Sequence, residues 1–96
     1  MRIASFAHKG LRQLYHQNSE RGLPAHSAHK LRNMLGFLDA MSDTRELLAP
    51  ALKWKAHRLS GNRDGTWALS VTGNWRLTFT VDAHGNLCDL NLEDYH

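Results

Sequence analysis

Residues suited to proton transfer and to phosphate binding recur at alternate positions in the second half of this 96-residue sequence. Lys53, Lys55 and His57 are separated by single residues, and Arg76 occupies a polar position in a later alternating segment. Because side chains two residues apart on a β-strand share a face, we expect these groups on one side of a sheet. Cleaving RNA without a metal needs a base for the 2′-hydroxyl, an acid for the leaving oxygen and cations for the developing charge. Histidine, with an ordinary pKa of about 6.5, serves as either acid or base, so the set favours phosphodiester chemistry.

The elements that must hold these residues are predicted by a change in hydrophobic period after Pro50. Four segments alternate between apolar and polar residues, and short Gly- and Asn-containing turns separate them. The predicted strands are residues 52–59, 66–72, 75–82 and 87–94. Connections this short join antiparallel neighbours, so we expect a sheet with one apolar face and one open face.

Before Pro50 the apolar residues follow the helical period. They predict a short helix over about residues 8–19 and a second helix after Pro24, which Asp43–Glu46 follows as a capping box. The core stripe of the second helix is predicted to be Ala28, Leu31, Leu35 and Leu38. Residues 2–7 form a short strand at best. We therefore expect a single α+β domain over residues 1–96, with two N-terminal helices packed on a twisted, mainly antiparallel sheet.

The alternation also assigns the side chains of the last strand to faces. Those expected to point into the core are Cys88, Leu90 and Leu92. Those expected on the open face are Asp89, Asn91, Glu93 and Tyr95. Asp94 and His96 have the core-side parity, and they join the open face only if the strand ends or bulges near Glu93.

Composition excludes several classes of protein. Hydrophobic residues make up 42% and charged residues 22%, which excludes a disordered or collagen-like chain. No apolar run approaches the roughly 20 residues that cross a bilayer, and no signal peptide is evident, so we expect a cytoplasmic protein without membrane contact. Residues 1–63 carry a net charge of +7 and residues 64–96 a net charge of −4. This asymmetry indicates a polyanionic partner about as readily as an ordinary solvated basic face.

Each candidate residue also has a simpler interpretation. An outward His57 is typical of a solvated surface histidine, and Arg76 could form a cross-strand ion pair with a sheet acid such as Asp89. His26 and His29 have the spacing of a metal pair, but no cysteine or second pair accompanies them. We therefore expect neither a metal site nor a cofactor.

The segment AHRLSGNRDGTWALSVTGNWRLTF, together with the terminal LEDYH, resembles the HigB branch of the RelE/ParE toxin superfamily, also called the plasmid-maintenance killer family. The most specific motifs are His57-x-Leu-x-Gly, Asn74-Trp-Arg and Asp94-Tyr-His. The resemblance covers the whole chain in length and element order. It implies a RelE-like fold, related to the microbial ribonucleases, and a toxin that cleaves mRNA in the ribosomal A site.

The resemblance implies site residues and partners as well. Its catalytic residues would be His57, Arg76, Asp94, Tyr95 and His96. Beside them we expect phosphate-binding cations at Lys53, Lys55, Arg58 and Arg63. The implied partners are a HigA-type helix-turn-helix antitoxin, the ribosome and mRNA, with operator DNA contacted only through the antitoxin complex. Ser60 and Ser70 stand where relatives often have basic residues, a departure that would weaken phosphate attraction more than proton transfer.

In the mechanism that we expect, His57 is the base and His96 the acid, while Asp94 supports an imidazole and Arg76 holds the phosphate. Two other functions stay open at this point. One is a ParE-like poison that binds a topoisomerase on the same fold. The other is a non-enzymatic module that binds RNA or a protein partner. Neither needs proton-transfer groups, and their presence favours the nuclease.

Overall fold

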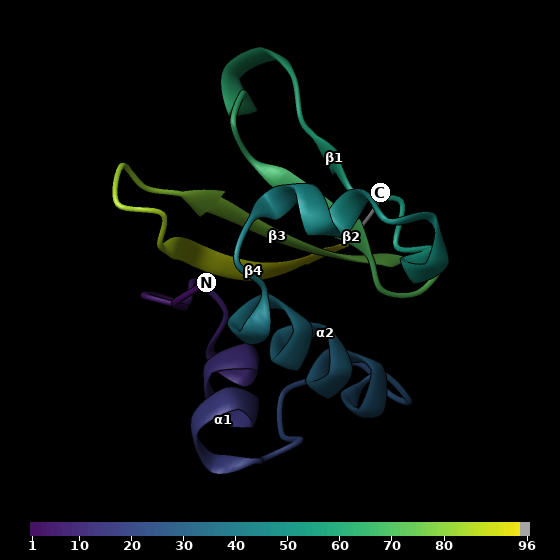
Figure 1. The fold of residues 1–96 in the computed structure, drawn as a ribbon. Coiled ribbons are helices and arrows are strands. Elements are labelled where there is room, and N and C mark those ends of the chain that lie inside the picture. Colours follow the sequence, from purple (N-terminus) through teal and green to yellow (C-terminus); the bar gives the residue numbers. More distant parts are fainter. Residues whose placement is uncertain (95–96) are drawn as a thin grey trace.

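The structure, a computed structural model, describes residues 1–94 and places two helices together against one face of a twisted sheet (Figure 1). The helices are α1 (Lys9–Gln17) and α2 (Ala28–Ala40), and three short 3-10 helices follow as η1 (Thr44–Leu48), η2 (Pro50–Leu52) and η3 (Gly61–Arg63). The strands are β1 (His57–Arg58), β2 (Trp67–Ser70), β3 (Trp75–Val81) and β4 (Leu87–Asp94). They form one antiparallel sheet in the order β1-β2-β3-β4. The predicted α+β arrangement is confirmed.

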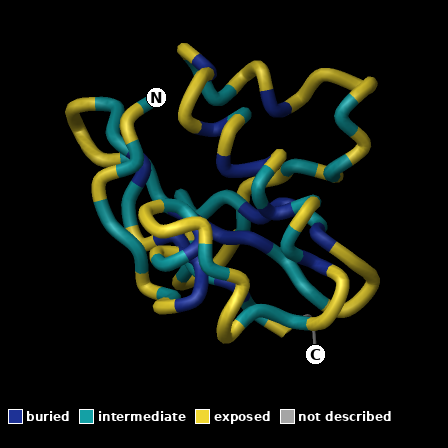
Figure 2. Tube along the Cα trace, turned by 90° about the horizontal axis from the view of Figure 1, so that it is seen from below, coloured by how far each residue is buried: buried dark blue, intermediate teal, exposed yellow. Residues whose placement is uncertain are grey.

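The core lies between the apolar stripes of the helices and the apolar face of the sheet. Figure 2 shows buried stretches along the strands and on the helices, while the connecting loops are exposed. The largest fully buried side chains include Leu11, Leu31, Leu38, Leu69, Leu77 and Phe79. Burial of each large apolar side chain contributes about 1.5–3 kcal/mol, so these stripes fix one face of the sheet against the helices. The opposite face, predicted to be open, carries the exposed His57 but is buried at Ala68 and Thr78. No helix within the described residues is long and apolar enough to span a membrane.

The N-terminal segment lies along the free edge of β4. Ile3 and Phe6 form parallel bridges with Leu87 and Leu90, and the amide of Ala4 donates to the Leu87 carbonyl at 2.7 Å. This pairing covers backbone groups that an edge strand would otherwise expose. It also accounts for the only parallel contact in a mainly antiparallel sheet, as far as residues 1–94 show.

A β-bulge in β4 corrects the predicted faces of that strand. Asp89 and Leu90 together oppose Phe79 of β3, and the backbone of Asp89 has a φ of +56°, in the left-handed region. The extra residue resets the alternation, so Leu87 and Leu90 both reach the core. Cys88 pairs with Thr80, whose side chain lies on the face away from the helices, and Cys88 is itself half-buried. Its predicted core position is therefore wrong.

The segment before β1 also departs from the prediction. A strand was expected over residues 52–59, but Lys53 and Lys55 have φ values of +58° and +53°, and only His57–Arg58 is a strand. The cause is the preceding 3-10 turn that begins at Pro50 and ends in a left-handed residue. The predicted alternation of exposure survives: the two lysines and His57 are exposed, and Trp54 packs half-buried against Phe37.

Gly10 marks a close approach between α1 and the loop that follows it. A Cβ at Gly10 would stand 2.9 Å from the carbonyl oxygen of Gly22, a backbone atom that cannot turn aside. We expect Gly10→Ala to lower the free energy of unfolding by about 1–3 kcal/mol. The matched control is Gly36→Ala in α2, where a Cβ would meet nothing within 4 Å and where helix propensity predicts a gain of about 0.5–1 kcal/mol. Urea unfolding of both variants checks the prediction, and equal shifts would contradict it.

His8 makes the start of α1 sensitive to pH. Its Nδ1 atom accepts a hydrogen bond from the amide of Leu11 at 3.2 Å, and only a neutral ring can accept that bond. Burial lowers the pKa of His8 below its ordinary value of 6.5. The unfolded chain therefore binds the proton more readily, so this contribution to stability is full above pH 6.5 and is lost as the pH falls through the folded pKa. We expect urea midpoints of wild type and His8→Asn to diverge on acidification, with Asn retaining its cap; parallel pH curves would refute this.

Candidate active site

Strand register places the predicted polar residues in rows on the open face of the sheet. One row across the four strands consists of His57, Ala68, Thr78 and Asn91. The next row consists of Ser70, Arg76 and Glu93. Arg76 thus faces away from the core, as predicted. His57 and Arg76 are two strands and one row apart, or roughly 12 Å between Cα atoms, which a bound nucleotide and the long arginine side chain span.

His57 is exposed and its ring is oriented by the backbone. The Nδ1 atom of His57 lies 2.9 Å from the carbonyl oxygen of Lys55, two residues earlier in the chain. Lys55 itself has a left-handed backbone conformation. A carbonyl oxygen only accepts hydrogen bonds, so Nδ1 carries the proton. In the neutral ring Nε2 then has the lone pair, which on an exposed side chain is suited to accept a proton from a substrate.

Glu93 is the centre of the polar network beside Arg76. Arg63 of η3 donates two hydrogen bonds to its carboxylate, at 2.8 Å and 2.6 Å, and the hydroxyl of Thr78 donates a third at 2.5 Å. The Nη2 atom of Arg76 lies 3.6 Å from Oε1 of Glu93, the carboxylate oxygen that does not accept from Thr78. The bonds from Arg63, with smaller help from Thr78 and the charge of Arg76, lower the pKa of Glu93 to about 2 despite its partial burial. Glu93 is therefore ionised throughout the neutral range.

This network was not predicted as such. The sequence placed Arg76 and Glu93 on the same face, and it raised a cross-strand ion pair, but with Asp89 as the example. The bulge determines the outcome, because it brings Glu93 opposite Arg76 and leaves Asp89 further along the sheet. The only indication of this contact in the sequence was that Arg76 and Glu93 both occupy positions expected to face away from the core.

The remaining predicted cations differ in their surroundings. Lys53 and Lys55 are exposed on the segment that leads to His57. Arg58 is also exposed but pairs with Trp67, so its side chain leaves the strand on the face opposite to that of His57. Arg63 is held by Glu93. The structure thus brings the two lysines near His57 and joins Arg63 to Arg76 through a carboxylate.

The predicted catalytic tail is described only in part. Asp94 is the last residue of β4 and pairs with Trp75. Its position in the alternation is that of the core-facing residues, but at the end of the strand its side chain is exposed. No bulge at Glu93 turns it to the open face. Tyr95 and His96 lie outside the described residues, and their approach to His57 stays a prediction.

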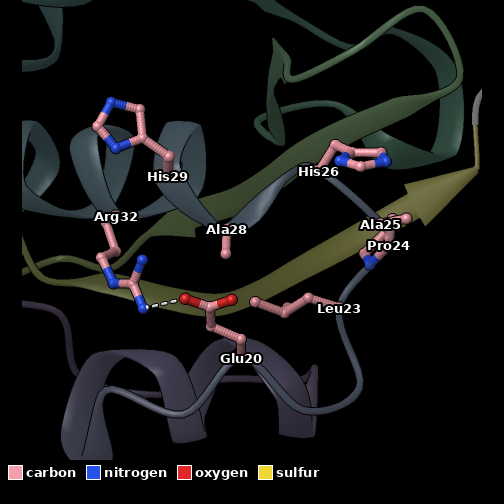
Figure 3. Close-up of a pocket in the computed structure, with 8 residues that line it drawn as sticks. All are labelled: Glu20, Leu23, Pro24, Ala25, His26, Ala28, His29 and Arg32. Carbon is pink, nitrogen blue, oxygen red and sulfur yellow. Dashed lines mark hydrogen bonds and ion pairs between the residues drawn. The ribbon is translucent and has the colours of Figure 1, made fainter.

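His26 and His29, which have the spacing of a metal-binding pair, are not arranged as two ligands of one metal ion. His26 precedes α2 with a φ of +63°, whereas His29 lies within the helix. Both line a surface pocket of about 450 Å³ in which Arg32 pairs with Glu20 at 2.7 Å, and their rings point away from each other (Figure 3). Within residues 1–94 no three His, Cys, Asp or Glu side chains are arranged to hold a metal ion.

Comparison with known proteins identifies the family. A family model described as the RelE-like toxin of the type II toxin–antitoxin system HigB matches residues 4–96. The chain belongs to the HigB-like toxin family. A relative named Endoribonuclease HigB, from Proteus vulgaris, is 37% identical to this HigB-like chain over 94 residues, which cover 98% of this chain and 99% of the relative.

Solved structures confirm the fold of this HigB-like toxin. YafQ from Escherichia coli strain BL21(DE3) aligns with a TM-score of 0.61 at 15% identity, over 99% of this chain and 94% of YafQ. A chain of the YoeB–YefM complex from Staphylococcus aureus aligns with a TM-score of 0.51 at 18% identity, over 100% of this chain and 99% of that one. At these identities the likeness concerns the RelE-like fold alone. Membership of a toxin–antitoxin family gives the chain an antitoxin as partner.

Proposed function

We propose that this HigB-like toxin is an endoribonuclease that cleaves mRNA in the ribosomal A site by metal-independent acid–base catalysis. The observation that carries the proposal is an exposed imidazole of fixed tautomer, His57, on the sheet face that bears Arg76. The family supports it, as does the name of the Proteus vulgaris relative, Endoribonuclease HigB.

In the proposed reaction, His57 Nε2 takes the proton of the ribose 2′-hydroxyl, and the 2′-oxygen attacks the adjacent phosphorus. The P–O5′ bond breaks and leaves a 2′,3′-cyclic phosphate. His96 supplies the proton to the leaving 5′-oxygen, with Asp94 favouring its charged form. Arg76 stabilises the charge that develops on the phosphate oxygens. Tyr95 stacks on a base or binds the RNA backbone.

Exposed cations extend this surface toward the flanking phosphates. We assign that role to the exposed Lys53 and Lys55, whereas the exposed Arg58 leaves β1 on the opposite face and lies outside this surface. With serine at positions 60 and 70, the surface has fewer cations than the family pattern, so we expect binding to free RNA to be weak and cleavage to depend on presentation of the RNA by the ribosome. A ribosomal substrate places the protein in the cytoplasm.

We further propose that the antitoxin is a HigA-type helix-turn-helix protein. The toxin would then reach operator DNA only as part of that complex. Its own net charge of +3 is modest for a duplex-binding protein, and its basic residues are spread over helices, loops and strands.

Mapping mRNA ends with purified toxin, with and without translating ribosomes, tests the proposal. We expect new ends within A-site codons when ribosomes are present, and few or none on the same mRNA alone. RNA binding without new ends would indicate a non-enzymatic module. Inhibition of DNA supercoiling in a parallel topoisomerase assay, again without new RNA ends, would indicate a ParE-like poison.

A further inference from the structure

We propose that Arg63 is a positioning residue: by binding Glu93, it limits how strongly that carboxylate holds Arg76, and so tunes the binding of the scissile phosphate. The inference rests on the proposed function and deepens it. It differs from the phosphate-binding role that the sequence predicted for Arg63. Arg63 and Glu93 are 30 residues apart and belong to η3 and β4, so the contact exists only in the folded chain.

Geometry shows that Arg63 is the stronger partner of Glu93. Its guanidinium engages both carboxylate oxygens, at 2.8 Å and 2.6 Å, in the two-pronged arrangement that gives the strongest charged hydrogen bonds. The Nη2 atom of Arg76 is 3.6 Å from the same carboxylate, beyond hydrogen-bond range. The side chain of Glu93 is only 19% exposed, so water does little to screen these charges.

Competition for the carboxylate gives Arg63 its proposed effect. A partly buried carboxylate that loses its main cation needs another one, because an unpaired charge there is costly. Arg76 is the nearest guanidinium on the facing strand, directly opposite Glu93 in the sheet. Without Arg63, we expect Arg76 to be drawn onto Glu93, and an RNA phosphate must then compete with a carboxylate for the same fork of donors.

A direct phosphate contact by Arg63 fits the geometry less well. Both terminal nitrogens of Arg63 donate to Glu93, so the two-pronged edge of the guanidinium is occupied, and a phosphate would meet only the remaining N–H groups beside a carboxylate that repels it. The pair also forms one wall of a depression of about 200 Å³ on the open face, where the Glu93 carboxylate would repel an anion. The carboxylate thus makes Arg63 a weak anion site and a strong structural partner.

The test compares Arg63→Gln, Glu93→Gln and the double variant Arg63→Gln/Glu93→Gln in single-turnover cleavage of ribosome-bound mRNA. We expect Arg63→Gln to raise the half-saturating concentration about tenfold, because its Glu93 then competes for Arg76. The double variant lacks the competing charge, and we expect it within about twofold of Glu93→Gln. A double variant as weak as Arg63→Gln would overturn the inference. Thermal unfolding of each variant confirms that a folded chain is being compared.

The salt dependence of binding to a short single-stranded RNA provides a second readout. Each phosphate contact contributes about 0.7 to the slope of log affinity against log salt concentration. If Arg63 acts through Glu93, the double variant and Glu93→Gln have equal slopes; a slope smaller by about 0.7 in the double variant shows a direct phosphate contact and overturns the inference. Wild-type toxin that cleaves no RNA would overturn the proposed function instead, while the slopes would still decide the role of Arg63.

Discussion

Replacing His57 by alanine is expected to lower the single-turnover rate of mRNA cleavage by about 10²–10⁴-fold, the usual contribution of a positioned acid–base group. The side chain is exposed, so its removal creates no cavity and the chain should fold normally. Rates on programmed ribosomes, measured over a range of pH, check the prediction. A base acts only when deprotonated, so the rising limb of the pH–rate profile should disappear in this variant.

A matched control for this variant is His84→Ala. His84 is likewise exposed, but it lies in the turn between β3 and β4. We expect its cleavage rate within about twofold of wild type. Equal rates for the two alanine variants would exclude His57 as the base. If His57→Ala and His96→Ala abolish the same limb of the profile, the division of roles between the two histidines is wrong.

Replacing Arg76 by alanine is expected to lower the cleavage rate by about 10²–10³-fold, because a donor aimed at the developing phosphate charge is lost. Arg76→Lys should recover only part of that loss, since an ammonium cannot reproduce the two-pronged guanidinium contact. Stability should change little in either variant. Arg63 keeps the Glu93 carboxylate paired when Arg76 is gone.

Single-turnover rates and urea unfolding together check the prediction for Arg76. Arg45→Ala is the control, because Arg45 of η1 is strongly exposed and pairs with Asp43, the N-cap of the same short helix. We expect that variant to cleave at the wild-type rate. If Arg76→Ala cleaves as fast as Arg45→Ala, the phosphate is held by another group and the proposed site is wrong.

Features encoded within a few neighbouring residues followed from the sequence itself. Alternation in residues 75–81 placed Arg76 on the face away from the core, and the structure agrees. Helical periodicity located α1 and α2, and Asp43–Glu46 forms the predicted capping box. These predictions succeed because period and capping depend on local backbone geometry, which a short stretch of sequence specifies.

Tertiary structure alone decided how the polar residues meet. The bulge at Asp89 reset the faces of β4, and strand pairing rather than periodicity determined that Glu93 lies opposite Arg76. The two hydrogen bonds between Arg63 and Glu93 join parts of the chain that no pattern in the sequence connects. A hydrophobic period specifies which face a side chain takes, but not which residue of another strand it meets, because that depends on register and on the cost of leaving a buried charge unpaired.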